Sequence, residues 1–308
     1  MKSIVLCARD GRPSMKNVYS KMSKGNLVVR RQINNSTYYR VYSGNNVTAL
    51  SKINKPNFAE TQVIIRWGTQ EEIADAKGSI IYNKAKSLSL ISNKYQSRLA
   101  MVKAGVHVPM NVTSATHEDL INYPVIARPF RHSKGKNFIT LKNRAAFLQH
   151  YGIHHSGWYY SNFIDKVREY RVHAAHGKIL NFLEKPNPGG GQIAWNRAQG
   201  NEPFVSVKWD QYDFGVALQA LKACQALGAD FLGVDVIVDR QGKAWVLEGN
   251  SAPTLNSSEY SCERYAKYFQ WLFMSPERRE HWDYNQFKDP QSFAWKNFQL
   301  EGKASGKD

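Results

Sequence analysis

Three oxygen-bearing side chains in the C-terminal third of the chain have the types and spacing of a divalent-metal site. Asp235, Glu248 and Asn250 belong to two apolar, β-rich runs separated by the turn-forming residues Asp-Arg-Gln-Gly, which predicts an antiparallel hairpin. Two carboxylates and a carboxamide oxygen form a hard oxygen site. Magnesium or manganese prefers such ligands and completes its shell with water and phosphate oxygens.

The expected register of this hairpin follows from its turn. Pairing Val238 with Lys243 leaves an even number of linking residues and places Asp235 opposite Val246. Glu248 shares the face of Val246 because strand side chains alternate with a period of two, so the two acids become diagonal neighbours. The alternative is that both acids are solvent-facing. An unpaired carboxylate inside such apolar strands would, however, be costly.

Cationic residues upstream of the hairpin are candidates for phosphate contacts. Lys94 opens a segment of helical periodicity behind Asn93, a good N-cap residue. Arg128 lies in a short strand, and Lys134 and Lys136 lie in the polar loop that follows it. Taken singly, a lysine of this kind is more often an ordinary surface charge, and this alternative stays open for each of them.

A second group of candidates follows a central strand. Arg171 alternates with Glu169 and His173, so all three can face one cleft, and Arg171 is our choice for the γ-phosphate or acyl-phosphate contact. The alternative is an ion pair between Arg171 and Glu169 on the outer face. A glycine-rich stretch follows and suits a lid that orders over substrate. Candidate contacts at its two ends are Lys185, Asn196 and Arg197.

The composition bounds the partners of the chain. Its 308 residues carry a formal net charge of +17, and 42% are hydrophobic, which excludes a mostly disordered protein. Residues 1–60 hold eleven Lys and Arg against two acids, and the tail after residue 275 mixes aromatic and basic residues. Such charge attracts an acidic or nucleic-acid partner, and the alternative is a solubilising surface.

Cysteine usage and hydropathy indicate the compartment. No run approaches the roughly 18 apolar residues of a membrane span, and the apolar N-terminal stretch is too short for a signal peptide. The three cysteines have no metal or disulfide spacing. We therefore expect a cytoplasmic protein without a membrane partner.

The order of these motifs resembles the ATP-grasp superfamily, and most closely its ribosomal-protein glutamate ligases. Asp235 and then Glu248-x-Asn250, followed by Ser-Ala-Pro-Thr-Leu, is similar to the family's C-terminal magnesium signature. Upstream, Asn93-Lys94 with its helix, the two strands and loop of 124–141, and the segments 160–164 and 169–173 resemble the first helix, phosphate flap, adenine hinge and cleft strand. The resemblance covers roughly residues 80–275.

The resemblance implies an α/β (α+β) protein with the ATP-grasp fold, in which two α+β subdomains clasp ATP behind a small α/β lobe. The implied domains are a basic N-terminal lobe, a small subdomain with the phosphate flap, a C-terminal subdomain with the magnesium site, and a basic, aromatic tail whose end is disordered. Their boundaries are 1–85, 86–160, 161–275 and 276–308.

The resemblance also implies an ATP- and magnesium-dependent ligase, with manganese as a substitute. It would join a carboxylate to an amine through an acyl phosphate and release ADP and phosphate. The implied metal ligands are Asp235, Glu248 and Asn250, and the implied catalytic residues are Arg171, Asn196 and Arg197. The implied nucleotide contacts are Lys94, Arg128, Lys134, Lys136, Tyr160, Ser161, Phe163, Ile164, Glu169 and Lys185. A homo-oligomer is expected at the level of the family.

The chain departs from the family pattern at three places. Arg128 stands where many members have lysine, the flap contains only Gly135, and the hinge has Ser161-Asn162 where an acid is common. Two other functions therefore stay open. One is a nucleic-acid-associated protein that uses the fold as a binding or modifying module, and the other is a catalytically idle ATP-binding scaffold.

Overall fold

The computed structural model describes most of the chain between residues 61 and 273 and parts of the segment before it. The described residues are 3–9, 18, 27–33, 36–43, 46–49, 61–68, 80–130, 138–154, 156–189, 191, 193, 195, 204–255 and 259–273. The chain forms two compact units. Unit 1 comprises residues 1–85, 208–212 and 251–308, and unit 2 comprises residues 86–207 and 213–250.

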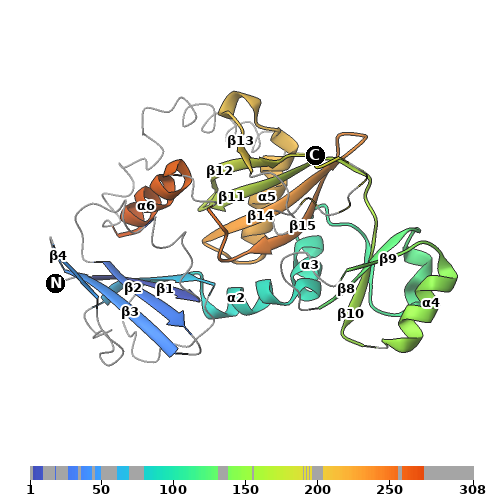
Figure 1. The fold of residues 1–308 in the computed structure, drawn as a ribbon, viewed down its shortest axis with the longest axis horizontal. Helices are drawn as coiled ribbons and strands as arrows, with labels where there is room; N and C mark the ends of the chain where they lie inside the picture. The colour runs from blue at the N-terminus through green and yellow to red at the C-terminus, as the bar shows by residue number, and fades with distance from the viewer. Residues whose placement is uncertain are drawn as a thin grey trace. The chain divides into compact units, whose positions relative to one another are not determined.

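Unit 1 contains a mixed six-stranded sheet, ordered β4-β3-β2-β1-β5-β6 (Figure 1). Its strands are β1 (Ser3–Arg9), β2 (Leu27–Ile33), β3 (Ser36–Ser43), β4 (Asn46–Ala49), β5 (Thr61–Trp67) and β6 (Ile80–Tyr82). Helix α6 (Glu259–Phe273) packs on β5 through the buried Trp67. The Trp67 ring lies 5.0 Å from Tyr265 and 6.1 Å from Phe269, edge to face in both cases.

Unit 2 contains two sheets, of which the smaller has the order β7-β10-β8-β9. Its strands are β7 (Asn111–Val112), β8 (Val125–Pro129), β9 (Ile139–Leu141) and β10 (Trp158–Asn162), with a 3₁₀ helix, η2 (Ala115–Leu120), after β7. Helix α4 (Arg144–Ile153) packs on this sheet through Phe147, which is fully buried and lies 4.8 Å from the Tyr160 ring, edge to face. This cluster forms the core of the small subdomain.

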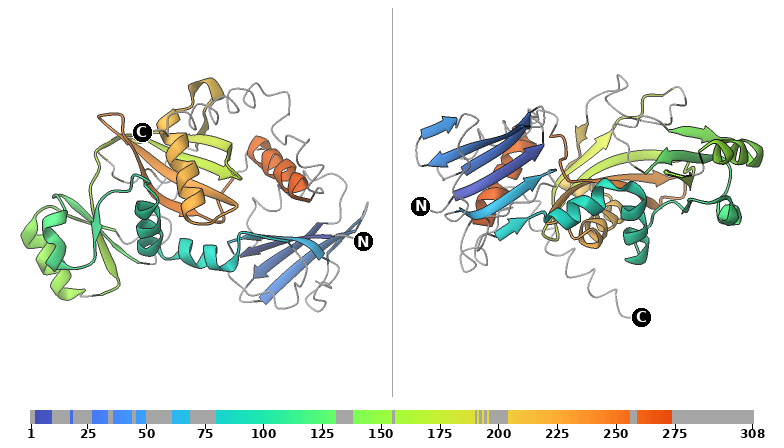
Figure 2. Two further views of the ribbon diagram at one scale, coloured as in Figure 1. Left: turned by 180° about the vertical axis from the view of Figure 1, so that it is seen from behind. Right: turned by 90° about the horizontal axis from the view of Figure 1, so that it is seen from below.

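The larger sheet of unit 2 is antiparallel and has the order β13-β12-β11-β14-β15. Its strands are β11 (Lys166–Ala175), β12 (Lys178–Lys185), β13 (Val205–Ser206), β14 (Phe231–Asp239) and β15 (Ala244–Asn250). Helix α5 (Phe214–Ala226) covers one face, as Figure 2 shows, with Asp213 as its N-cap. A short 3₁₀ helix, η4 (Trp209–Gln211), lies in unit 1. The face opposite α5 is called the site face below.

Helix α3 (Lys94–Lys103), which follows α2 (Ala85–Ser92), connects the two sheets of unit 2. Asn93 caps it by accepting a hydrogen bond of 3.1 Å from the amide of Gln96. The amide of Lys94 donates to the carbonyl of Phe130 at the end of β8 (2.9 Å). Beyond the helix, the carbonyl of His107 accepts from Val246 of β15 (2.7 Å). The first residue of α3 is thus fixed between both sheets.

We expect Phe147→Ala to lower the free energy of unfolding by about 3–5 kcal/mol, because the cavity left in the small subdomain has no neighbour that can fill it. Leu148→Ala is the matched control, since Leu148 is 36% exposed in the same helix turn. It should cost less than about 1 kcal/mol. Urea unfolding of both variants measures the difference, and equal losses would contradict this account of the core.

Candidate active site

The predicted register of the β14–β15 hairpin is wrong by one residue at its turn. Val238 pairs with Ala244 and not with Lys243, so five residues and not four link the strands. Asp239 causes the difference, because its carboxylate accepts hydrogen bonds from the amides of Gln241 and Lys243 and widens the turn.

A β-bulge in β15 then changes the pairing again. Val236 pairs with Val246, whereas the next residue back, Asp235, pairs with Glu248 and leaves Leu247 as the extra residue. Asp235 and Glu248 are therefore directly opposite each other and not diagonal. Without the bulge, Glu248 would point towards α5.

Gly249 keeps the two oxygen-bearing residues of β15 on the site face. A side chain at Gly249 would come within 2.8 Å of Leu232 and 3.1 Å of Leu227, both packed on the α5 side. Glu248 and Asn250 point the other way, and the Nδ2 group of Asn250 donates to Oε1 of Glu248 (3.3 Å). The three predicted metal ligands thus share one face.

Asp235 is buried and paired, so the alternative of a solvent-facing acid is wrong. It is 5% exposed, and Arg171 directly opposite on β11 holds both carboxylate oxygens at 2.7 Å. Burial would raise the pKa of Asp235, but Arg171 and Lys185 outweigh it and hold that pKa well below its usual range. The carboxylate is therefore ionised at neutral pH.

The ion pairs continue across the sheet. Lys185 of β12 is 3.5 Å from Asp235 and also pairs with Glu169, which pairs in turn with Lys166. Lys185 and Glu169 are 2% and 4% exposed. The predicted alternative of an Arg171–Glu169 pair is wrong, because each of these residues has a different partner.

Lys94 reaches the same face from the first turn of α3. Its ammonium donates to the carbonyl of Gly249 (2.9 Å) and lies 3.5 Å from Glu248. An ammonium has three N–H donors, so a further one is available for a phosphate oxygen.

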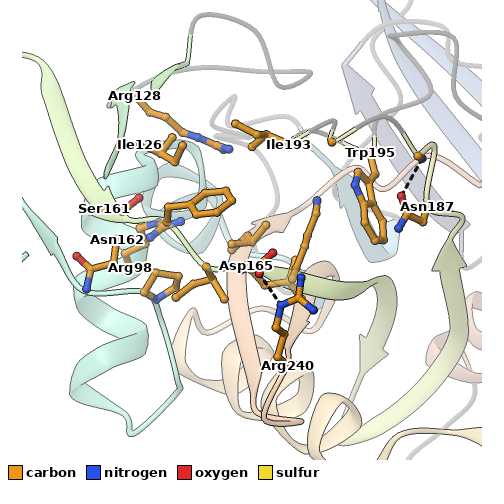
Figure 3. A pocket seen from close by; sticks show the side chains of 18 residues that line it. Arg98, Ile126, Arg128, Ser161, Asn162, Asp165, Asn187, Ile193, Trp195 and Arg240 are labelled. Carbon is orange, nitrogen blue, oxygen red and sulfur yellow. Dashed lines mark hydrogen bonds and ion pairs between the residues drawn. The ribbon is translucent and has the colours of Figure 1, made fainter. Parts of the chain in front are cut away.

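A pocket of about 450 Å³ shares Lys166 with this charged cluster, and Figure 3 shows its lining. The lining includes Ser161 of β10, Phe163 and Ile164 of the segment between β10 and β11, and Ile237 and the bulged Leu247 of the hairpin. The apolar side chains among these suit a flat ring. The pocket also holds Arg98, Ile126, Arg128, Asn162, Asp165, Lys166, Asn187, Trp195 and Arg240.

The predicted site residues fall into four sets. One lies on the site face or at its edge: Lys94, Glu169, Arg171, Lys185, Asp235, Glu248 and Asn250. A second lines the pocket: Arg128, Ser161, Phe163 and Ile164. Tyr160 belongs to neither, since its ring lies in the core of the small subdomain and its hydroxyl contacts His150. Lys134, Lys136, Asn196 and Arg197 lie outside the described residues.

Sequence reasoning missed several residues of the pocket. Arg98 lies one helical turn after Lys94, a spacing that could have identified it. Lys166 stacks on the Trp195 ring at 4.4 Å, and burial lowers its pKa although Glu169 opposes this. Asp165 and Arg240 pair at 2.6 Å. No sequence pattern predicts these last contacts, because they join segments far apart in the chain.

The donor set fits a magnesium ion. Asp235, Glu248 and Asn250 offer hard oxygens on one face, and each Asp235 oxygen keeps a lone pair beyond its bond to Arg171. Within the described ranges, no group of three or more His, Cys, Asp and Glu side chains is placed to hold a metal ion. A magnesium ion held by these two carboxylates would complete its coordination shell with oxygens from an amide, water and phosphate, which is common for magnesium sites.

Solved structures with a similar fold are ATP-grasp ligases. The ligase PsnB bound to a minimal precursor superposes with a TM-score of 0.60 at 13% identity, over 87% of this chain and 98% of that one. The D-Ala:D-Ser ligase VanG of Enterococcus faecalis gives 0.57 at 14%, over 83% and 92%. A RiPP-associated ATP-grasp ligase of Chryseobacterium gregarium, in complex with ADP and a leader and core peptide, gives 0.57 at 10%, over 86% and 96%. The chain has the ATP-grasp fold, as its motif order predicts.

Curated proteins are also similar in sequence. Human N-acetylaspartylglutamate synthase A is 22% identical in an alignment of 198 residues that covers 60% of this chain and 49% of that protein. The chain thus spans about half the length of this curated relative. No family model matches the chain. Among the described helices, none is long and apolar enough to cross a membrane.

We expect the protein to lose stability as the pH falls below about 6.5. Burial, with Arg171 adding to it, lowers the pKa of His173 to about 3, against 6.5 in the unfolded chain. The unfolded state therefore binds more protons below pH 6.5, and His173 alone should cost about 2 kcal/mol at pH 5.

Urea unfolding at pH 7.5 and pH 5 tests this expectation. His173→Gln should remove much of the pH dependence, whereas His117→Gln, at an exposed position, should keep that of the wild type. An identical pH dependence in the wild type and His173→Gln would show that His173 is protonated in the folded state.

Proposed function

We propose that the protein is an ATP- and magnesium-dependent ligase that joins a carboxylate to an amine. The observation that carries the proposal is the direct pairing of Asp235 with Glu248, with Asn250 on the same face, beside a pocket of about 450 Å³. Cations from two strands and one helix surround these acids. The arrangement suits a triphosphate whose base lies in the pocket and whose γ-phosphate reaches the acids.

The proposed reaction has two steps. A carboxylate oxygen of the first substrate attacks the γ-phosphorus of ATP, the bond from that phosphorus to the β,γ-bridging oxygen breaks, and ADP leaves. The amine nitrogen of the second substrate then attacks the acyl carbon, phosphate leaves with the acyl oxygen, and the nitrogen loses a proton. Such phosphoryl transfer asks the protein chiefly for positioning and charge neutralisation.

Each side chain of the cluster has a task in this proposal. Asp235, Glu248 and Asn250 would hold the magnesium ion, which neutralises phosphate charge and orients the transferred group. Lys94 binds a phosphate oxygen with its remaining donor. Arg171 fixes both oxygens of Asp235 and, from the same guanidinium, stabilises the acyl phosphate. Lys185 pairs with both Glu169 and Asp235 and so offsets part of their negative charge.

The similar proteins support an amide-forming reaction. VanG is a D-Ala:D-Ser ligase, PsnB and the Chryseobacterium enzyme are ATP-grasp ligases with peptide ligands, and the human relative is a synthase of N-acetylaspartylglutamate. We therefore infer that the carboxylate or the amine of this chain's reaction belongs to an amino acid or peptide. The nucleic-acid alternative rests on residues 1–60 and the tail after 275, whose side chains lie outside the described residues.

We expect Glu248→Gln to lower turnover by at least about 100-fold, because it removes a charge that the metal and phosphates need. Asp235→Asn should have the same effect and also lower stability, since Arg171 and Lys185 lose a buried partner. The measurement is ADP release that depends on an added carboxylate and amine, with circular dichroism as the check on folding.

Glu184→Gln is the matched control for these variants. Glu184 lies next to Lys185 on β12 but points towards α5, where it pairs with Arg168. It should keep turnover within about twofold of the wild type. A wild-type rate in Glu248→Gln would remove Glu248 from the metal site.

We expect Arg171→Ala to lower turnover more than about tenfold, a loss of over about 1.4 kcal/mol of transition-state stabilisation. Arg171→Lys should recover only part of it, because an ammonium keeps the charge and loses the fork that holds both oxygens of Asp235. Arg168→Ala, on the same strand and the opposite face, is the control and should stay within about twofold. An unchanged rate in Arg171→Ala would place Arg171 outside the reaction.

A further inference from the structure

Two cations of the site face contact the same aromatic ring. The centre of the Phe204 ring lies 5.2 Å from the guanidinium carbon of Arg171 and 5.5 Å from the ammonium nitrogen of Lys185. Both distances are those of a cation–π contact, which becomes stronger when the cation is desolvated. The side chains of Arg171 and Lys185 are 14% and 2% exposed, so both cations have lost most of their water.

Strand pairing holds Phe204 beside these cations. The residue directly precedes β13, and Val205 of that strand pairs with Glu184 of β12. Phe204 therefore lies at the register position of Lys185. Its ring is on the site face because paired residues of a sheet present their side chains on the same face. The amide of Val207 adds a hydrogen bond to a carbonyl of β12 (3.0 Å).

The guanidinium of Arg171 is held in two independent ways. Nε and Nη2 donate to the two oxygens of Asp235 at 2.7 Å, and the Phe204 ring is the second contact. An arginine has five N–H donors, so three remain after the bonds to Asp235. The side chain of Phe204 has no oxygen or nitrogen atom. It therefore constrains the guanidinium and leaves these donors for a phosphate oxygen.

The carboxylate that holds Arg171 is also a proposed metal ligand. When a divalent ion binds Asp235, it becomes the largest local charge and shares the carboxylate oxygens with Arg171. The hold of Asp235 on the guanidinium then weakens. The contact with Phe204 does not use those oxygens, so it persists when the metal binds.

We propose that Phe204 is a positioning residue of the ligase site, which keeps the guanidinium of Arg171 oriented towards the acyl phosphate while Asp235 binds magnesium. The proposal rests on the proposed function for the reaction and on the two aromatic contacts for the role of Phe204. The ring also keeps water away from both cations, which strengthens their attraction to phosphate. Phe204 thus acts through Arg171 and Lys185.

Turnover of Phe204 variants tests this role. Phe204→Leu keeps an apolar side chain without the ring, and we expect kcat to fall at least about fivefold while the KM for ATP stays within about twofold. Phe204→Tyr keeps the aromatic face and should stay within about twofold of the wild type in both. The assay is ADP release from ATP with magnesium and a mixture of amino acids. A wild-type kcat in Phe204→Leu, or equal losses in both variants, would overturn the proposal.

A phenylalanine analogue with three ring fluorines at position 204 separates electrostatics from packing. Fluorine withdraws electrons from the ring face, so the attraction to both cations weakens while the side chain keeps nearly the same size. We expect kcat to fall at least about threefold. An unchanged kcat would mean that Phe204 only fills space and would overturn the proposal. Phe214→Leu, at the 48% exposed first position of α5, is the control and should stay within about twofold.

Urea unfolding of the metal-free protein measures the contact apart from the reaction. In a double-mutant cycle, the effects of Phe204→Leu and Arg171→Met on the unfolding equilibrium constant should deviate from a simple product by at least about threefold. The same cycle with Arg144→Met, an exposed arginine that pairs with Glu118, should show no deviation. A simple product with Arg171→Met would overturn the proposal. If Arg171→Met does not fold, the fluorinated ring decides.

The outcomes separate this proposal from the proposed function. A wild-type protein that forms no amide would contradict the proposed function, and the metal-free cycle would still test the contact of Phe204 with Arg171. Amide formation with an unchanged rate in Phe204→Leu would contradict the Phe204 proposal alone.

Discussion

The ion pair between Arg171 and Asp235 is the interaction on which the rest of the site depends. Two buried charges of opposite sign stabilise each other only when their strands are in register, because removing either partner leaves an uncompensated charge in the sheet. Lys185, Glu169 and Lys166 extend the cluster, so three cations surround two acids. That excess of positive charge favours an anion at the site face, and a phosphate chain is an anion of suitable length.

The bulge at Leu247 restores the grouping of Asp235 with Glu248 that the longer turn alone would break. The sequence predicts an even turn and a regular hairpin, whereas the structure has an odd turn and one extra residue in β15. Each departure alone would turn Glu248 towards α5. Together they cancel, so the predicted grouping of Asp235 with Glu248 holds although its register is wrong. The Asp239 carboxylate accepts from two amides of the turn and so accompanies the first departure, and the second places Leu247 in the pocket lining.

The strands and the helices around α3 and α5 could be predicted because their periodicity and caps are local properties. Helix α4 was not predicted. Its buried residues Phe147 and His150 are explained by their contacts with Tyr160 of a later strand, and the local sequence does not reveal those contacts. The network of Glu169 was not predicted either, because it joins residues 166, 169 and 185 through sheet pairing. The sequence shows which residues are charged, but only the tertiary structure determines which of them pair.

The two ends of the site differ in how tightly their chemistry is constrained. On the sheet, strand pairing fixes the carboxylates and cations, and a change at one position disturbs several partners. At the pocket end, Arg98 projects from a helix, and its described surroundings include the Tyr159 ring, Arg128 and Glu248. Replacing Arg98 breaks no strand pairing, so the sheet constrains this position less than it constrains the acids.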